Sequence, residues 1–256
     1  MKQAFVYLLE MMALQFVGGF VVSQAWQLAT GSADKTTALL ITSTVFVSVL
    51  TIAVFLLARW TEVSPRWLRT RQWGVLAWSV VAALGMIIPS EWLQEQLPAL
   101  PNWMEDDFSM LLSSRWGYLS IALLAPLSEE IVFRGAILRS LLSSPRLTPW
   151  GAIAVSALFF ALVHLNPAQM PHAFLVGLLL GWMYWRTGSI LPGMVYHWVN
   201  NSLAYVITNI YQDPDIRLID IFGGSQQHVL LSVLFSLLIL LPALYQLHLW
   251  MKPACR

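Results

Sequence analysis

The 256-residue chain is 58% hydrophobic and only 11% charged, with a mean hydropathy of +0.67. Because a water-soluble domain carries about 25% charged residues, this composition excludes an ordinary soluble enzyme and indicates an integral membrane protein. The 14 Lys and Arg residues nearly balance the 13 Asp and Glu residues, so the charge predicts no nucleic-acid partner. The single cysteine, Cys255, provides neither a disulfide framework nor a cysteine zinc site.

Eight apolar runs are long enough, or nearly so, to cross about 30 Å of hydrocarbon, which takes about 20 helical residues. In chain order they are residues 4–28, 38–57, 74–88, 116–142, 150–165, 168–185, 190–210 and 229–249. The third, fifth and sixth runs are short or interrupted, and the first is expected to be a retained span. We therefore predict an all-α polytopic membrane helix bundle of about eight transmembrane helices, with residues 1–256 forming one membrane domain.

Basic residues gather on one side of this arrangement, as the positive-inside rule expects. With a cytoplasmic N-terminus, the inner side receives Lys2, Arg59, Arg66, Arg69, Arg71, Arg139, Arg146, Arg186, Lys252 and Arg256, and the outer side only Lys35, Arg115 and Arg217. We therefore expect a bacterial inner membrane with both termini cytoplasmic. Residues 89–114 are rich in acids and prolines, which indicates an outer loop with a surface-lying amphipathic piece.

Three ionisable residues, Glu129, Glu130 and Arg134, lie in the middle of the fourth run. Each ionised side chain there costs about 2.5–3.5 kcal/mol on insertion scales, so the cluster is a candidate functional site. Residues four apart share a helix face, which predicts an ion pair between Glu130 and Arg134. Glu129 is rotated by about 100° and remains as a carboxylate free to act as a general base. The alternative is a helix-packing ion pair with one spare acid.

Further polar residues lie in later runs. His164 lies near the end of the fifth run, and His197 and Asn201 share one face of the seventh. Taken singly, each histidine is also explained as a buried side chain bonded to a backbone carbonyl. Asn200 and Asn201 are likewise explained as interhelical hydrogen bonds, worth about 0.6 kcal/mol on average. Together, however, a carboxylate, two imidazoles and a carboxamide form a set that can activate water and stabilise an oxyanion.

Three short motifs, each inside an apolar run, now suggest a family. In this order they resemble those of the CAAX protease and bacteriocin-processing (Abi) family of intramembrane endopeptidases: Glu129-Glu130-x-x-x-Arg134, Phe160-x-x-x-His164 and His197-x-x-x-Asn201. The family is similar to the Ras-converting CAAX endopeptidase. The resemblance covers residues 116–209, which we expect to be the catalytic core.

The resemblance implies a role for each motif residue. Glu129 is expected to be the general base, assisted by His164, that deprotonates a water for attack on the scissile carbonyl. His197 and Asn201 are expected to stabilise the oxyanion, and the predicted ion pair to support the site from behind. No cofactor is expected.

A metal-dependent mechanism is the alternative, with Glu129, His164 and His197 as a zinc site and Asn201 nearby. No His-Glu-x-x-His pair is present, which favours the metal-free mechanism.

The depths of the candidate residues present a geometric problem. At 1.5 Å per residue, Glu129 lies near mid-depth, whereas His164 lies close to the outer end of its run. The two meet only if the fifth span is tilted, begins below the membrane surface, or is followed by a turn at residues 166–167 inside the protein. Such a turn must line a cavity, so we predict a water-accessible cavity, opening toward the cytoplasm by analogy with the family.

Two features of the sixth run complete the set. Gly177 and Gly181 form a pair of small residues that predicts close helix packing. His172 either contacts substrate or caps the turn after Pro171.

We conclude that the sequence predicts an intramembrane endopeptidase acting on a membrane-associated or lipid-anchored polypeptide, surrounded by membrane lipids and independent of nucleic acid. A non-catalytic bacteriocin-immunity or scaffold protein and a proton-coupled transporter remain as alternatives. The absence of an inverted sequence repeat disfavours the transporter.

Overall fold

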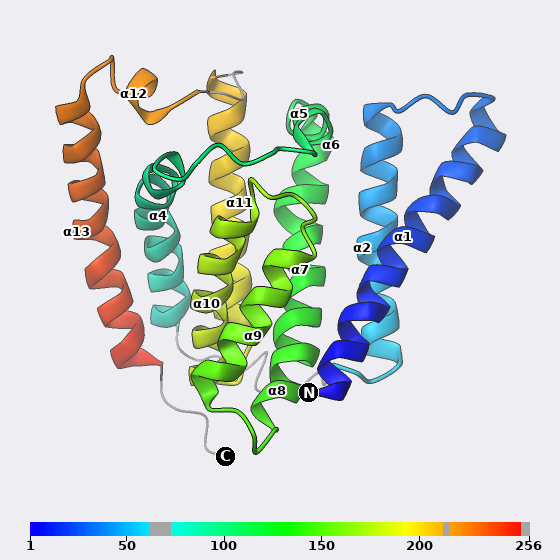
Figure 1. The fold of residues 1–256 in the computed structure, drawn as a ribbon, viewed down its shortest axis with the longest axis horizontal. Helices are drawn as coiled ribbons and strands as arrows, with labels where there is room; N and C mark the ends of the chain where they lie inside the picture. Colours follow the sequence, from blue (N-terminus) through cyan, green and yellow to red (C-terminus); the bar gives the residue numbers. More distant parts are fainter. Residues whose placement is uncertain (62–72, 212–215, 252–256) are drawn as a thin grey trace.

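The computed structural model describes residues 1–61, 73–211 and 216–251. Within these ranges the chain is helical and forms no strand, which confirms the predicted all-α class there. The helices, labelled as in Figure 1, are α1 (Lys2–Thr30), α2 (Thr37–Leu57), α4 (Trp73–Glu95), α5 (Glu105–Leu112), α6 (Arg115–Tyr118), α7 (Ala125–Glu130), α8 (Arg139–Leu142), α9 (Pro149–Leu162), α10 (Met170–Thr187), α11 (Leu191–Tyr211), α12 (Leu218–Ile221) and α13 (Gln226–Trp250).

Each predicted apolar run coincides with a helix or with joined helical segments. Four helices, α1, α2, α4 and α13, are long and apolar enough to cross a membrane by length and composition, as expected of an integral membrane protein. The total of eight spans stays a prediction. The 14-residue α9 is about 21 Å long, too short to cross the hydrocarbon layer by itself.

One boundary prediction is wrong. Helix α4 does not end at residue 88 but continues through Pro89 to Glu95, so the first part of the predicted outer loop is helical. A proline removes only one intrahelical hydrogen bond, and neighbouring helices can support the helix there. The rest of residues 89–114 contains α5, an eight-residue helix that matches the predicted amphipathic piece.

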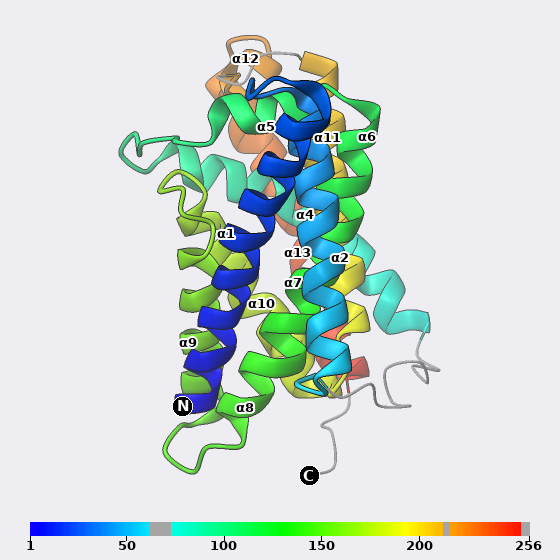
Figure 2. The same ribbon diagram turned by 90° about the vertical axis from the view of Figure 1, so that its right-hand side faces the viewer.

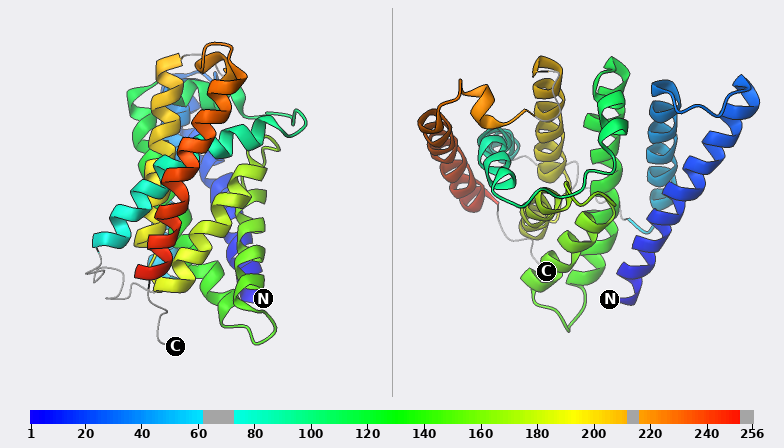
Figure 3. Two further views of the ribbon diagram at one scale, coloured as in Figure 1. Left: turned by 90° about the vertical axis from the view of Figure 1, so that its left-hand side faces the viewer. Right: turned by 45° about the horizontal axis from the view of Figure 1, so that its top comes forward.

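Two groups of long helices stand on either side of the bundle. Helices α1 and α2 pack together on one side, and α4, α11 and α13 pack together on the other (Figures 1 and 2). Residues 115–142 and the α9–α10 pair lie between them, as the view from the tilted top also shows (Figure 3). The start of α1 and the end of α13 lie at the same end of the bundle, as an even number of crossings requires.

Charged residues are distributed as the orientation model requires, where the structure describes them. The ends of α2 and α10 and the start of α8, near Arg59, Arg186 and Arg139, lie at the end of the bundle that holds the N-terminus (Figure 1). The side of the membrane that this end faces stays a prediction. Several residues in that argument lie outside the described residues: Arg66, Arg69, Arg71, Lys252 and Arg256, together with the single cysteine, Cys255.

Residues 115–142 form one continuous helical path that twice departs from α-helical winding. The segments Leu119–Leu124 and Ile131–Leu138 have π-helical hydrogen bonding, and the short α-helix α7 lies between them. Single π-helical turns are frequent at functional sites because they re-aim side chains and release backbone groups. The two adjacent glutamates are the last two residues of α7, where the winding changes.

Helices α9 and α10 form an antiparallel hairpin whose turn follows His164. The turn lies below the upper ends of α2, α11 and α13 (Figure 1), so the chain does turn back inside the protein, as one of the three sequence-based solutions required. The predicted close packing is also confirmed. A Cβ atom on Gly177 would lie 3.0 Å from Ala157, and one on Gly181 would lie 2.9 Å from Ile153, both on α9.

Candidate active site

The predicted ion pair is present and fully buried. Arg134 Nη1 lies 2.7 Å from Glu130 Oε1, with side-chain exposures of 1% and 0%. Arg134 Nη2 also donates to the carbonyl of Gly177 on α10 at 3.2 Å, and its guanidinium carbon lies 4.7 Å from the centre of the Phe160 ring. These contacts tie the motif helix to the α9–α10 hairpin. Sequence analysis did not identify the Gly177 carbonyl, because a backbone acceptor leaves no trace in residue type.

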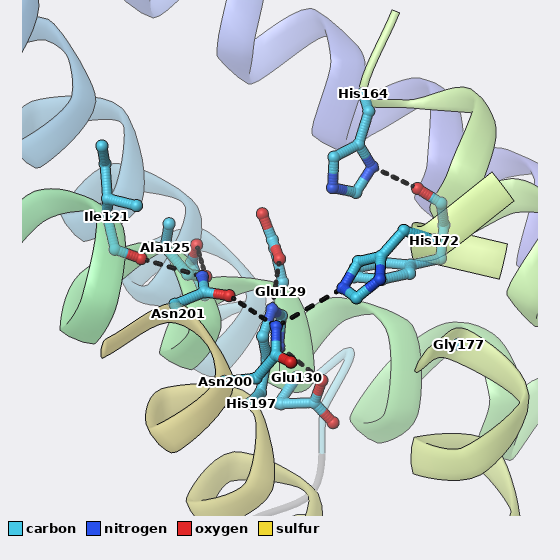
Figure 4. Close-up of polar contacts among 12 residues, drawn as sticks. Ile121, Ala125, Glu129, Glu130, His164, His172, Gly177, His197, Asn200 and Asn201 are labelled. Carbon is cyan, nitrogen blue, oxygen red and sulfur yellow. Dashed lines mark hydrogen bonds and ion pairs between the residues drawn. The ribbon is translucent and has the colours of Figure 1, made fainter. Parts of the chain in front are cut away.

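His197 lies between the two glutamates. Its Nδ1 is 3.2 Å from Glu130 Oε1 and its Nε2 is 3.6 Å from Glu129 Oε2 (Figure 4). Glu130 Oε1 accepts a hydrogen bond from Arg134, so we assign the proton of His197 to Nδ1, which donates to the same oxygen. This hydrogen bond fixes the ring and directs Nε2 toward the Glu129 carboxylate. The 3.6 Å separation is too long for a direct hydrogen bond and suits a shared water.

Of the two glutamates, only Glu129 has a partly exposed side chain. Its side chain is 20% exposed, whereas that of Glu130 is completely buried. It borders a cavity of about 280 Å³ between α1, α2 and α7, room for roughly nine water molecules at about 30 Å³ each. Hydration of this cavity and the direction of its mouth stay predictions.

The cavity is lined on the α2 side by a polar stripe that the sequence analysis missed. Thr44, Ser48 and Thr51 are spaced four and three apart, so they share one helix face, and Gln15 of α1 lies opposite. Ser48 and Thr51 are buried, at 5% and 2% exposure. The spacing could have been noticed inside the apolar run 38–57. It was ambiguous because Ser and Thr in membrane helices often bond their own backbone.

Asn201 is held by a carbonyl that the motif helix leaves free. Its Nδ2 donates to the Ile121 carbonyl at 3.1 Å. In the π-helical turn the N–H of Ala125 bonds to the carbonyl of Ser120, five residues earlier. The same spacing pairs the Ile121 carbonyl with Pro126, which has no N–H. The proline and the π-helical winding together therefore release an acceptor that orients Asn201.

His164 lies just past the end of α9 and faces the same site. Its Nδ1 donates to the Phe160 carbonyl at 2.7 Å, so the interpretation as a side chain bonded to backbone holds for this nitrogen. The other ring nitrogen points toward the Glu129 carboxylate (Figure 4). Leu165, the next residue, has a φ of 50°, a left-handed conformation uncommon for leucine that sharpens the turn. The buried Asn166 anchors that turn through hydrogen bonds with Asn102 and the Trp103 N–H.

The structure thus brings all six predicted site residues into one region, including Glu129, His164, His197 and Asn201 around its centre (Figure 4). Within the described ranges, no three His, Cys, Asp or Glu side chains are arranged to hold a metal ion. Metal dependence stays an experimental question.

Two neighbours of the site were not assigned a site role from the sequence. Gly193 of α11 packs against the buried glutamate, since a Cβ atom there would lie 2.9 Å from Glu130 Oε2. Asn200 contacts His172 of α10 at 3.5 Å, a pairing that joins two helices across the site. Both features depend on which residues face each other between helices, and a single sequence does not report that.

Fold and site together define a helical integral membrane protein with a carboxylate–imidazole–carboxamide site buried in its bundle. Residues 111–203 match the family model described as type II CAAX prenyl endopeptidase Rce1-like. That range covers less than half of the chain and contains all three motifs, and the match supports the resemblance to the CAAX protease family. No curated protein and no solved structure matches the chain.

Proposed function

We propose that the chain is a glutamate-dependent intramembrane endopeptidase that hydrolyses a peptide bond of a lipidated or membrane-associated polypeptide. The observation that carries the proposal is the position of the Glu129 carboxylate, 3.6 Å from His197 Nε2 and on the wall of a partly open cavity between α1, α2 and α7. A carboxylate beside a neutral imidazole nitrogen can hold and deprotonate a water. The family match supplies the reaction class.

Each residue then has a defined task. Glu129 accepts the proton of the attacking water, and His197, fixed through Nδ1 by Glu130, positions that water through Nε2. Asn201, whose amide is oriented by the Ile121 carbonyl, is the donor to the developing oxyanion. This assignment differs from the sequence-based one, because the imidazole beside Glu129 is His197, whereas oxyanion stabilisation had been expected of it. His164, whose second ring nitrogen points toward the Glu129 carboxylate, assists proton transfer.

The test is cleavage of a synthetic fluorescent peptide ending in S-farnesylcysteine and three further residues, the last of which is varied. Purified wild-type protein in nanodiscs should cleave it, and Glu129→Gln should reduce kcat by at least about 100-fold, the lower range for a general base. Glu10→Gln is the matched control, since Glu10 is an exposed glutamate of α1 outside the site. Cleavage by Glu129→Gln at the wild-type rate would refute the mechanism.

Two additional arms separate the alternatives. A metal-free mechanism predicts that cleavage continues after treatment with a chelator, whereas loss of activity restored by zinc would favour the metal-dependent one. A scaffold or immunity protein would be indicated if no variant cleaves the peptide and cells that carry Glu129→Gln keep the full phenotype of cells that carry the wild-type protein. Uptake driven by a pH gradient in vesicles, again without cleavage, would indicate a transporter.

A further inference from the structure

Two polar residues that are not among the fixed positions of the three motifs lie at the site. Asn200 of α11 is 5% exposed, and its Nδ2 lies 3.5 Å from His172 Nε2 and 3.5 Å from Asn201 Oδ1 (Figure 4). His172 lies in the first turn of α10 and faces Asn200 across the site. The proposed mechanism uses neither side chain.

The donors and acceptors around Asn200 determine the orientation of its side-chain amide. The Ile121 carbonyl can only accept, so Asn201 must turn its Nδ2 toward it and its Oδ1 toward Asn200. Asn200 must then present its own Nδ2 to that oxygen. Its second amide hydrogen is directed at His172 Nε2, which acts as the acceptor. Both donors of Asn200 are therefore used, and only its Oδ1 is left.

The remaining oxygen is buried and, among the described residues, has no hydrogen-bond partner. Buried acceptors in native proteins nearly always have a partner, and an exception indicates that water, an ion or a ligand completes the site. An amide oxygen calls for an N–H or O–H donor. An anion is excluded as its partner because anions accept hydrogen bonds, as the oxygen itself does.

We propose that Asn200 Oδ1 accepts a hydrogen bond from a main-chain N–H of the substrate peptide next to the scissile bond, and that His172 is the positioning residue that holds the Asn200 amide in this orientation. This inference rests on the proposed endopeptidase function and names one element of its substrate recognition. Asn200 adjoins Asn201, so the same contact sets the register of the peptide against the proposed oxyanion donor. The site thereby selects an amide over an ester at one backbone position.

The experiment measures binding, which does not require turnover. Full-length Glu129→Gln protein in nanodiscs is titrated with the fluorescent farnesylated peptide and with four analogues. Each analogue replaces one of the last four amide N–H groups by an ester oxygen, which deletes the donor without adding bulk. One analogue should bind about fivefold more weakly than the peptide, the loss expected for a single neutral hydrogen bond.

Substitutions identify the acceptor. Adding Asn200→Leu should weaken binding of the all-amide peptide about fivefold and abolish the penalty of that one ester. Adding His172→Phe, which keeps a ring but removes its nitrogens, should reduce the penalty while leaving binding of the ester analogue unchanged. Asn209→Leu is the matched control: Asn209 is on the same helix but bonds to Leu112 and Tyr205 carbonyls, so the ester penalty should persist.

An equal ester penalty with and without Asn200→Leu overturns the inference, as does the absence of a penalty at all four positions. Failure to bind the all-amide peptide also overturns it. The cleavage assay on protein that retains Glu129 then separates the two proposals. Cleavage without an Asn200-dependent ester penalty leaves the endopeptidase standing and rejects this contact alone, whereas loss of both cleavage and binding rejects both.

Discussion

Replacing Arg134 with methionine removes the counter-charge of a fully buried glutamate while keeping most of the side-chain volume. Breaking a buried pair by removing one partner costs about 3–5 kcal/mol, because the other charge is left uncompensated. The variant also deprives the Gly177 carbonyl of its donor at 3.2 Å, about 1 kcal/mol more. We therefore expect the free energy of unfolding to fall by about 4–6 kcal/mol, enough to unfold a marginally stable protein.

The double variant Glu130→Gln/Arg134→Met decides whether charge is the reason. It removes both ions, and the glutamine oxygen can still accept from His197, so most of the lost stability should return. The measurement is unfolding in mixed micelles titrated with SDS, followed by tryptophan fluorescence. Arg115→Met, outside the buried site, is the control and should change stability by less than about 0.5 kcal/mol. Glu130→Gln is also measured alone. If the losses of stability in Arg134→Met and Glu130→Gln add up to the loss in the double variant within about 0.5 kcal/mol, the pair is not coupled and the reasoning fails.

Three further predictions concern neighbours of the site. Gly193→Ala should lower the free energy of unfolding by about 1–3 kcal/mol and lower kcat, because its Cβ atom would lie 2.9 Å from the buried Glu130 carboxylate. Gly19→Ala, with no atom near the added Cβ, is the control and should leave stability unchanged or raise it. Melting curves and turnover numbers of the two variants test this. Ser48→Cys, in a variant that lacks the native cysteine, should react with a membrane-impermeant thiol reagent because water is expected to fill the cavity. Val49→Cys should not react, because this exposed apolar position of α2 is expected to face lipid. Equal reactivity of the two variants would contradict a hydrated cavity. Asn166→Leu should destabilise the turn after α9 by about 1–3 kcal/mol, because it removes the hydrogen bonds to Asn102 and Trp103. It should also reduce kcat, because His164 lies at the start of that turn. Unchanged hydrogen exchange of the turn would contradict this prediction.

The ion pair of the motif helix could be predicted from the sequence because it depends on local geometry. A spacing of four brings Glu130 and Arg134 onto one face, and the structure places their charged atoms 2.7 Å apart. The rotation of Glu129 away from its neighbour is equally local. The same reasoning placed His197 and Asn201 on a common face of one helix, where both now face the site.

What could not be predicted depends on relations between helices. The short α9 and the left-handed Leu165 bring His164 to the depth of the glutamates, and neither has a periodic signal. The free Ile121 carbonyl requires knowledge of the π-helical winding before Pro126. The length of an apolar run predicts the presence of a helix well but its ends poorly, so the continuation of α4 past Pro89 was not predicted.

Adjacent glutamates with opposite surroundings explain how one helix can hold both a structural charge and a reactive one. Glu130 satisfies one oxygen with Arg134 and His197, and the tight approach of Gly193 leaves no room for a side chain beside the other. Glu129, one residue earlier, borders a cavity lined in part by hydroxyl groups. Because His197 lies beside both carboxylates, we expect the buried pair to influence the proposed general base, Glu129, through the imidazole. A change at Arg134 should therefore alter the pH profile of cleavage, even in the double variant whose stability returns, and an unchanged profile would show that Glu129 acts independently of the pair.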